Sequence, residues 1–239
     1  MNHFEEELSP RGQEKLNVGL NLVRQSYHTY SLVWKAFNNR PFHETRDRDL
    51  RLKDISINEV VPIDWLEDSA IVPDPFFYDI GRDLAIEEKK FLYQSIKENV
   101  EAPARQIPEI NRLIVIRIVE EFVRVNNPNP VLLIPAELSI PLYIENGGVE
   151  FEENREFLRV SPNVRLQLLL LSKYVKSKDL LLIDKSFGRW IFLEGNYNSL
   201  SIETRRFDQD KFLIIAKTTA IFKIENPGAA HAHIIQVGQ

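Results

Sequence analysis

The chain has 239 residues, of which 44% are apolar and 27% are charged, and its formal net charge is −5 at pH 7. A chain of this length can bury a sizeable core, and the absence of cysteine excludes disulfides, thiolate metal sites and cysteine nucleophiles. Acidic and basic residues are well mixed without a basic stripe, which argues against specific binding of nucleic acid. No signal peptide and no apolar run long enough to span a bilayer are visible, so we expect a cytoplasmic protein without a membrane partner.

The first predicted element is a helix that begins at Ser9 and Pro10, since serine is a good N-cap and proline suits the first helical position. Apolar side chains then recur at alternating spacings of four and three, which places them on one stripe of a helix. The stripe consists of Leu16, Leu20, Val23, Tyr27, Tyr30, Trp34 and Phe37. Such a stripe needs a partner surface, either in its own domain or in another chain.

Residues 45–65 predict an exposed β-arm or hairpin. Leu50 and Leu52, and then Ile55 and Ile57, lie two apart with polar residues between them, as in strands with one solvated face. The mixed charges at 46–49 indicate either a solvated face or ion pairs between subunits.

Helices and strands follow in mixed order. A second amphipathic helix is expected within 73–100, a proline-bounded loop at 101–108 is the best internal boundary, and a third helix is expected from about Pro108 to Asn126. "VLLIP" predicts a buried strand and "IENGG" a turn, and the chain beyond it is mainly β, with "VRLQLLLLSKYV" as a helix or a strand.

Residues suited to catalysis or metal binding are sparse. His231 and His233 share a face of a strand, but no third metal ligand is indicated. Asp184 and Glu194 bracket a predicted hairpin and do not complete a nuclease motif. No phosphate loop, dinucleotide fingerprint or nucleophile elbow is present. We therefore expect no enzyme, metal or cofactor, and we expect surfaces through which the protein contacts copies of itself.

Five segments resemble, in order and local character, those of the encapsulins, shell-forming proteins that share the fold of tailed-bacteriophage major capsid proteins. The segments are "LSPRGQEKLNVGLNLVRQSYHTY", "RLKDISINEVVPIDW", "DIGRDLAIEEKKFLYQSIKEN", "EINRLIVIRIVEEFVRVNNPNPVLLIPAEL" and "TTAIFKIENPGAAHAHI". The last is the most specific: the resemblance implies that the turn at 226–228 connects two adjacent strands and that the two histidines are strand residues.

The resemblance implies an α+β fold of the tailed-phage capsid type. Its parts would be an N-terminal helical arm (1–40), an extended β-arm and a peripheral domain with a long helix (41–107), and a compact axial domain (108–239). The implied function is self-assembly into a closed icosahedral shell, an encapsulin-like nanocompartment that encloses a cargo protein. The alternatives are a major capsid protein of a tailed bacteriophage or provirus, located in the virion, and a soluble α+β binding or scaffold protein.

The resemblance also implies candidate binding residues. In encapsulins the N-terminal helix faces the interior and helps to bind a short cargo peptide. The corresponding candidates for a cargo groove, or for its support, are Leu16, Leu20, Val23, Tyr27, Tyr30 and Trp34. The turn near the symmetry-axis pores of the family corresponds to Glu145, Asn146 and Gly147.

Overall fold

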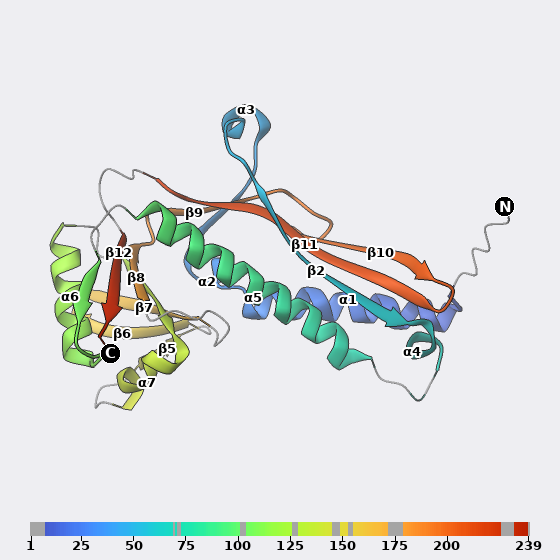
Figure 1. The fold of residues 1–239 in the computed structure, drawn as a ribbon, viewed down its shortest axis with the longest axis horizontal. Coiled ribbons are helices and arrows are strands. Elements are labelled where there is room, and N and C mark those ends of the chain that lie inside the picture. Colours follow the sequence, from blue (N-terminus) through green and yellow to red (C-terminus); the bar gives the residue numbers. More distant parts are fainter. Residues whose placement is uncertain are drawn as a thin grey trace. The chain divides into compact units, whose positions relative to one another are not determined.

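The computed structural model divides the chain into two compact units (Figure 1). The first unit comprises Met1–Ser31, Pro41–Glu87 and Phe192–Ala220, and the second comprises Leu32–Arg40, Glu88–Ile191 and Ile221–Gln239. The residues that the structure describes are 8–68, 70, 73–100, 104–125, 129–144, 149–152, 155–171, 179–225 and 232–238.

The first unit contains α1 (Pro10–Tyr30), which begins where the sequence predicts. The Ser9 hydroxyl accepts a hydrogen bond from the Gly12 amide at 3.1 Å, and Pro10 lies in the first turn, so the predicted cap is confirmed. The Ser9 amide also donates to Glu67 Oε1 at 2.8 Å, at the end of α4 (Ile63–Glu67). The start of α1 is therefore tied to a segment more than fifty residues away.

α1 packs very closely against the first half of α5 (Asp74–Asn99), the second predicted helix. A Cβ atom at Gly81 would lie 2.1 Å from the Val23 carbonyl oxygen and 2.0 Å from Ser26 Oγ. Only glycine permits this approach of two helix backbones.

The strands β2 (Lys53–Pro62), β10 (Leu200–Asp208) and β11 (Lys211–Ile224) run side by side (Figure 1). β11 pairs antiparallel with both of the others, so that Ile214 lies opposite Thr204 on one side and Glu59 on the other. The same sheet also contains β1 (Asn38–Pro41) and β9 (Gly188–Phe192), in the order β1-β9-β11-β10.

The second sheet has seven strands in the described part of the chain, in the order β3-β12-β8-β4-β7-β6-β5. Their bounds are Arg105–Ile107 (β3), Pro130–Pro135 (β4), Val149–Glu152 (β5), Arg155–Ser161 (β6), Val164–Leu171 (β7), Asp179–Asp184 (β8) and Ala232–Val237 (β12). β4 and β8 lie inside the sheet and are buried at every residue, which confirms the predicted buried strand at "VLLIP".

The core of the second unit lies between this sheet and α6 (Arg112–Val125), the third predicted helix. Val115, Val119 and Phe122 of α6 belong to one buried cluster with Leu132 and Leu182 of the sheet. α6 begins four residues later than predicted, because Asn111 caps it by accepting a hydrogen bond from the Ile114 amide at 2.9 Å.

The seven-residue stripe does not lie on one helix, contrary to the prediction. α1 ends at Tyr30, where extended Ser31 donates its amide to the Tyr27 carbonyl, and Trp34 lies on a separate short helix, α2 (Val33–Ala36). Phe37 follows α2 and packs edge-to-face on Phe222 at 4.9 Å. The apolar spacing continues past the end of the helix because Trp34 and Phe37 belong to the second unit, where Phe37 is part of the apolar packing.

Two predicted pairings of strands are also wrong. β8 and β9 are separated by the turn at 185–187 and do not form a hairpin, because β8 pairs with β4 and β12 whereas β9 lies in the other sheet. β11 and β12 likewise belong to different sheets and are not adjacent strands, and the predicted turn at 226–228 itself lies outside the described residues. Consecutive apolar strands cannot reveal which sheet each one joins.

The predicted β-arm is partly helical. Its strand is β2, whereas Leu50 and Leu52 lie outside strands and a short helix, α3 (Glu44–Asp47), precedes them. The buried Asp47 carboxylate accepts a hydrogen bond from the His43 amide at 2.9 Å and stabilises this turn. "VRLQLLLL" forms the strand β7, and α7 (Ala136–Ile144), which was not predicted, follows β4.

Candidate functional site

Three of the six proposed cargo residues are buried in the first unit. Leu16, Val23 and Tyr27 are at most 3% exposed, and they lie on the face of α1 that carries the close contact with α5. In this arrangement their side chains support the helix, and only residues at the edges of the stripe are open to a ligand.

Leu20 lies at one edge of the buried stripe and is half-buried. One turn further along α1, the Arg24 guanidinium lies over the Tyr197 ring at 5.3 Å from its centroid. This edge therefore offers an aliphatic side chain, a cation and an aromatic ring on the first unit.

Tyr30 lies at the other edge and is also half-buried. Its hydroxyl accepts a hydrogen bond from the Tyr78 hydroxyl at 3.3 Å, and the two rings meet edge-to-face at 6.0 Å. The hydrogen bond to Tyr30 is the main cause that raises the pKa of Tyr78 above its ordinary value.

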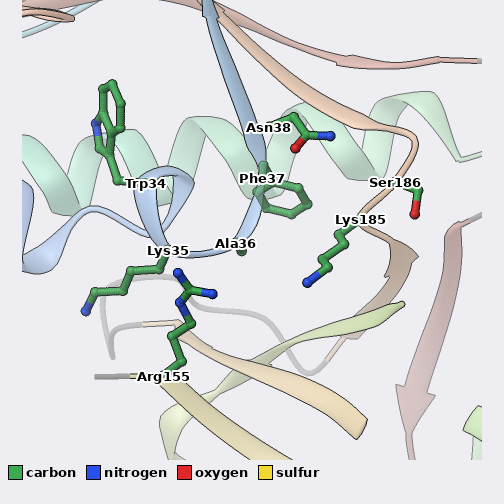
Figure 2. Close-up of a pocket in the computed structure, with 8 residues that line it drawn as sticks. All are labelled: Trp34, Lys35, Ala36, Phe37, Asn38, Arg155, Lys185 and Ser186. Atoms are coloured by element: carbon green, nitrogen blue, oxygen red, sulfur yellow. The ribbon is translucent and has the colours of Figure 1, made fainter. Parts of the chain in front are cut away.

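Trp34, the sixth candidate, belongs to the second unit and lines a cavity of about 390 Å³ (Figure 2). The cavity also contains the cationic side chains Lys35, Arg155 and Lys185. Sequence analysis missed this basic cavity because its charges come from three distant segments, none of which has a recognisable motif.

Large apolar side chains are exposed on both units. The first unit exposes Val18, Trp65, Leu193 and Phe207, and the second exposes Leu113, Ile140, Ile144 and Phe151. Ile140 and Ile144 lie one turn apart on α7, and Ile144 is 77% exposed. Such side chains are suited to contacts with another protein surface.

The pore candidates Glu145, Asn146 and Gly147 lie outside the described residues, immediately after α7. The same holds for His231, while His233 lies on β12 without a described side chain.

Within the described ranges, no group of three or more His, Cys, Asp or Glu residues is arranged to hold a metal ion. Asp184 is fully buried and its Oδ1 accepts a hydrogen bond from the Ser186 amide at 2.9 Å, whereas Glu194 is exposed and belongs to the other unit. The carboxylate of Asp184 thus shapes the turn after β8. No described helix is both long and apolar enough to cross a membrane.

Solved structures with the same arrangement of elements are shell proteins. A virus-like particle from Pyrococcus furiosus superimposes with a TM-score of 0.61 at 11% identity, over 94% of this chain and 98% of that one. The chain has the capsid fold. It is the α+β fold of encapsulins and tailed-phage capsid proteins, as the resemblance implied.

Two further structures extend the similarity to both groups. The SrpI encapsulin from Synechococcus elongatus PCC 7942 gives a TM-score of 0.55 at 11% identity, covering 84% of this chain and 85% of that one. A structure from Mycobacterium phage Che8 gives a TM-score of 0.52 at 13% identity, covering 78% of this chain and 72% of that one. No protein-family model and no curated protein matches the sequence itself. The capsid fold is therefore evident from the structure, and the structural neighbours are shell proteins rather than enzymes.

Proposed function

We propose that this protein is a structural protein that assembles with copies of itself into a closed icosahedral shell. The observation that carries the proposal is the match to the Pyrococcus furiosus virus-like particle, which spans nearly the whole of both chains.

The exposed side chains support assembly. Ile140 and Ile144 on α7 and Phe207 on β10 are all more than half exposed, and another copy could bury them. The segment 42–52, with exposed charges around α3, would form ion pairs across a neighbour. Closed point-group symmetry repeats each modest contact many times.

The assembly test is the particle mass of the purified protein, from size-exclusion chromatography with light scattering and from electron microscopy. Uniform closed particles in the megadalton range are expected. A small discrete oligomer would contradict the shell and favour the soluble binding or scaffold protein.

We propose further that the shell encloses a cargo protein, held through a short peptide at the Leu20 edge of α1. The half-buried Leu20 and the stacked pair Arg24 and Tyr197 would contact apolar and acidic or aromatic peptide side chains. The buried side chains of Leu16, Val23 and Tyr27 would support this edge, and Tyr30 would lie at the other edge of the stripe.

The cargo test compares Leu20→Asp with Val18→Asp on the opposite, exposed face of α1. We expect full-size particles from both variants, with cargo lost only from Leu20→Asp, as judged by mass spectrometry of purified particles. Loss of cargo only from Val18→Asp would place the peptide on the other face. Tyr27→Asp is unsuited to this test, because Tyr27 is fully buried and the variant is expected to be insoluble.

A phage or provirus capsid is the second candidate, and the match to Mycobacterium phage Che8 favours it. A nanocompartment would be cytoplasmic and filled with protein, whereas a capsid would become part of a virion and package DNA. The ratio of absorbance at 260 and 280 nm of purified particles, before and after nuclease treatment, distinguishes the two contents.

The residues after α7 complete the proposal. We propose that Glu145, Asn146 and Gly147 line a pore at a symmetry axis of the shell. Glu145→Gln should then slow the entry of a small cation into sealed particles without changing their mass.

A further inference from the structure

The cavity in the second unit has the composition of an anion site, and we call it the basic pocket. It has a volume of about 390 Å³, within the range of small-molecule sites. Its lining consists of Trp34, Lys35, Ala36, Phe37, Asn38, Arg155, Lys185 and Ser186. In the view of Figure 2, the guanidinium of Arg155 lies between the side chains of Lys35 and Lys185.

The three cations gather there without carboxylates. Lys35, Arg155 and Lys185 are all half-buried, and among the described residues none of them forms an ion pair. Like charges in a partly desolvated space repel one another, so an anion would relieve the repulsion.

The carboxylates nearest in sequence are engaged elsewhere. Glu152 pairs with Arg165 at 2.8 Å, and Glu156 accepts a hydrogen bond from the Tyr143 hydroxyl. Asp184, next to Lys185, is fully buried and accepts the Ser186 amide. None of these three carboxylates forms an ion pair with Lys35, Arg155 or Lys185.

The pKa of a fourth cation, Lys89, is affected by the charge of Lys35. Burial is the main cause that lowers the pKa of Lys89 to about 8, and the positive charge of Lys35 lowers it further, while Glu88 acts in the opposite direction. The charge of Lys35 is therefore near enough to Lys89 to act on its pKa.

Neutral donors complete the pocket. The Ser186 Oγ accepts a weak hydrogen bond from the Asn129 amide at 3.4 Å, which leaves its own proton to donate, and the Asn38 side chain is exposed. Cations together with hydroxyl and amide donors are the groups that bind oxyanions in proteins.

The walls of the pocket are held in place by hydrogen bonds. Gln167, which is 2% exposed on β7, donates its amide to the Lys35 carbonyl at 3.1 Å. The side-chain amide of Asn39 donates to the Val33 and Phe37 carbonyls. The backbone amide of Lys185 donates to the Asn129 carbonyl. The cations therefore extend from backbone that is already ordered before a ligand binds.

We propose that the basic pocket binds a small, multiply charged phosphate anion. Arg155 would bind two phosphate oxygens in a bidentate manner, Lys35 and Lys185 would neutralise the remaining charge, and Ser186 would donate to a further oxygen. This site does not depend on shell assembly, because all of its lining residues belong to one unit of one chain.

The test is titration calorimetry of the full chain with inorganic pyrophosphate, at an ionic strength kept constant with sodium chloride. We expect saturable binding by the unmodified protein. Arg155→Gln and Lys185→Gln should each weaken binding about tenfold or more, since a hydrogen bond to a charged group is lost. Lys185→Arg should retain the affinity.

The matched control is Arg159→Gln, on the same strand as Arg155 but with a 62% exposed side chain paired to Glu150. It should bind like the unmodified protein. Equal losses in Arg159→Gln and Arg155→Gln, or no saturable binding, would overturn the proposal.

Two competing ligands distinguish the source of the anion. Tighter binding of citrate than of pyrophosphate would overturn the phosphate assignment and favour the carboxylates of an acidic peptide. Tighter binding of a single-stranded oligonucleotide, lost in Arg155→Gln, would overturn the small-anion assignment and favour nucleic acid. Thermal unfolding of every variant, measured without ligand, verifies that each one is folded.

Discussion

The two units bury their apolar side chains in different ways. The first unit relies on close approach between long elements, where Gly81 lets the backbone of α5 meet α1. The second unit is stabilised by the large apolar side chains of α6 and of the fully buried strands β4 and β8, which fill a contiguous core. The first arrangement cannot tolerate one added methyl group, whereas the second should lose stability in proportion to the atoms removed.

The largest effect is expected from Gly81→Ala in the first unit. Alanine in a helix interior normally stabilises it relative to glycine by about 1 kcal/mol. Here the added Cβ would lie 2.1 Å from the Val23 carbonyl oxygen, so we expect a loss of about 3 kcal/mol or more, or insolubility. Denaturant unfolding of the soluble protein measures the loss.

Gly238→Ala is the control for this prediction. Its Cβ would lie no closer than 3.4 Å to other atoms, so stability should be unchanged. A stabilised Gly81→Ala variant would mean that α1 and α5 do not approach as described.

The core of the second unit is tested by Leu132→Ala. Leu132 is 1% exposed within the buried cluster, and the lost contacts and the cavity should lower the free energy of unfolding by about 3 kcal/mol. Leu113→Ala, at a side chain of α6 that is 75% exposed, should change it by less than about 0.5 kcal/mol. Similar losses in both variants would contradict the assignment of the core.

Lys89→Met removes a buried charge from the second unit. Because burial and then Lys35 lower the pKa of Lys89 to about 8 from 10.5, the unfolded chain binds more protons than the folded chain between these values. Stability should therefore rise with pH from about 8 to 10.5, and the full penalty is present below pH 8. The methionine variant should be more stable at pH 7 by about 2 kcal/mol and should lack this rise.

Unfolding curves from pH 7 to 10.5 provide the measurement. Lys223→Met, at an exposed position of the same unit, should behave like the unmodified protein. A less stable Lys89→Met variant would show that the partners of Lys89 outweigh its burial.

The smallest effect is expected at the helix cap of the first unit. Ser9→Ala removes the acceptor of the Gly12 amide and should lower the free energy of unfolding by about 1 kcal/mol. Ser9→Thr keeps the hydroxyl and should restore most of the loss, as measured by denaturant unfolding. An unchanged Ser9→Ala variant would mean that the end of α1 is frayed.

Several elements were predictable because their signals are local. Ser9 and Pro10 mark the start of α1, and the apolar run at Pro130–Pro135 indicated a buried strand. Of the candidate site, the sequence predicted the stripe on α1 but not which of its side chains stay open. Leu20 and Tyr27 have the same periodicity, and only packing against the rest of the first unit buries one and leaves the other at an edge.

The sequence by itself determined where most helices and strands lie, because capping and apolar periodicity act within a few residues. Only the tertiary structure decided that α1 ends at Tyr30, that β8 and β9 join different sheets, and that Lys35, Arg155 and Lys185 share one pocket. These features depend on contacts between segments far apart in the chain, and such contacts leave no periodic pattern in the sequence.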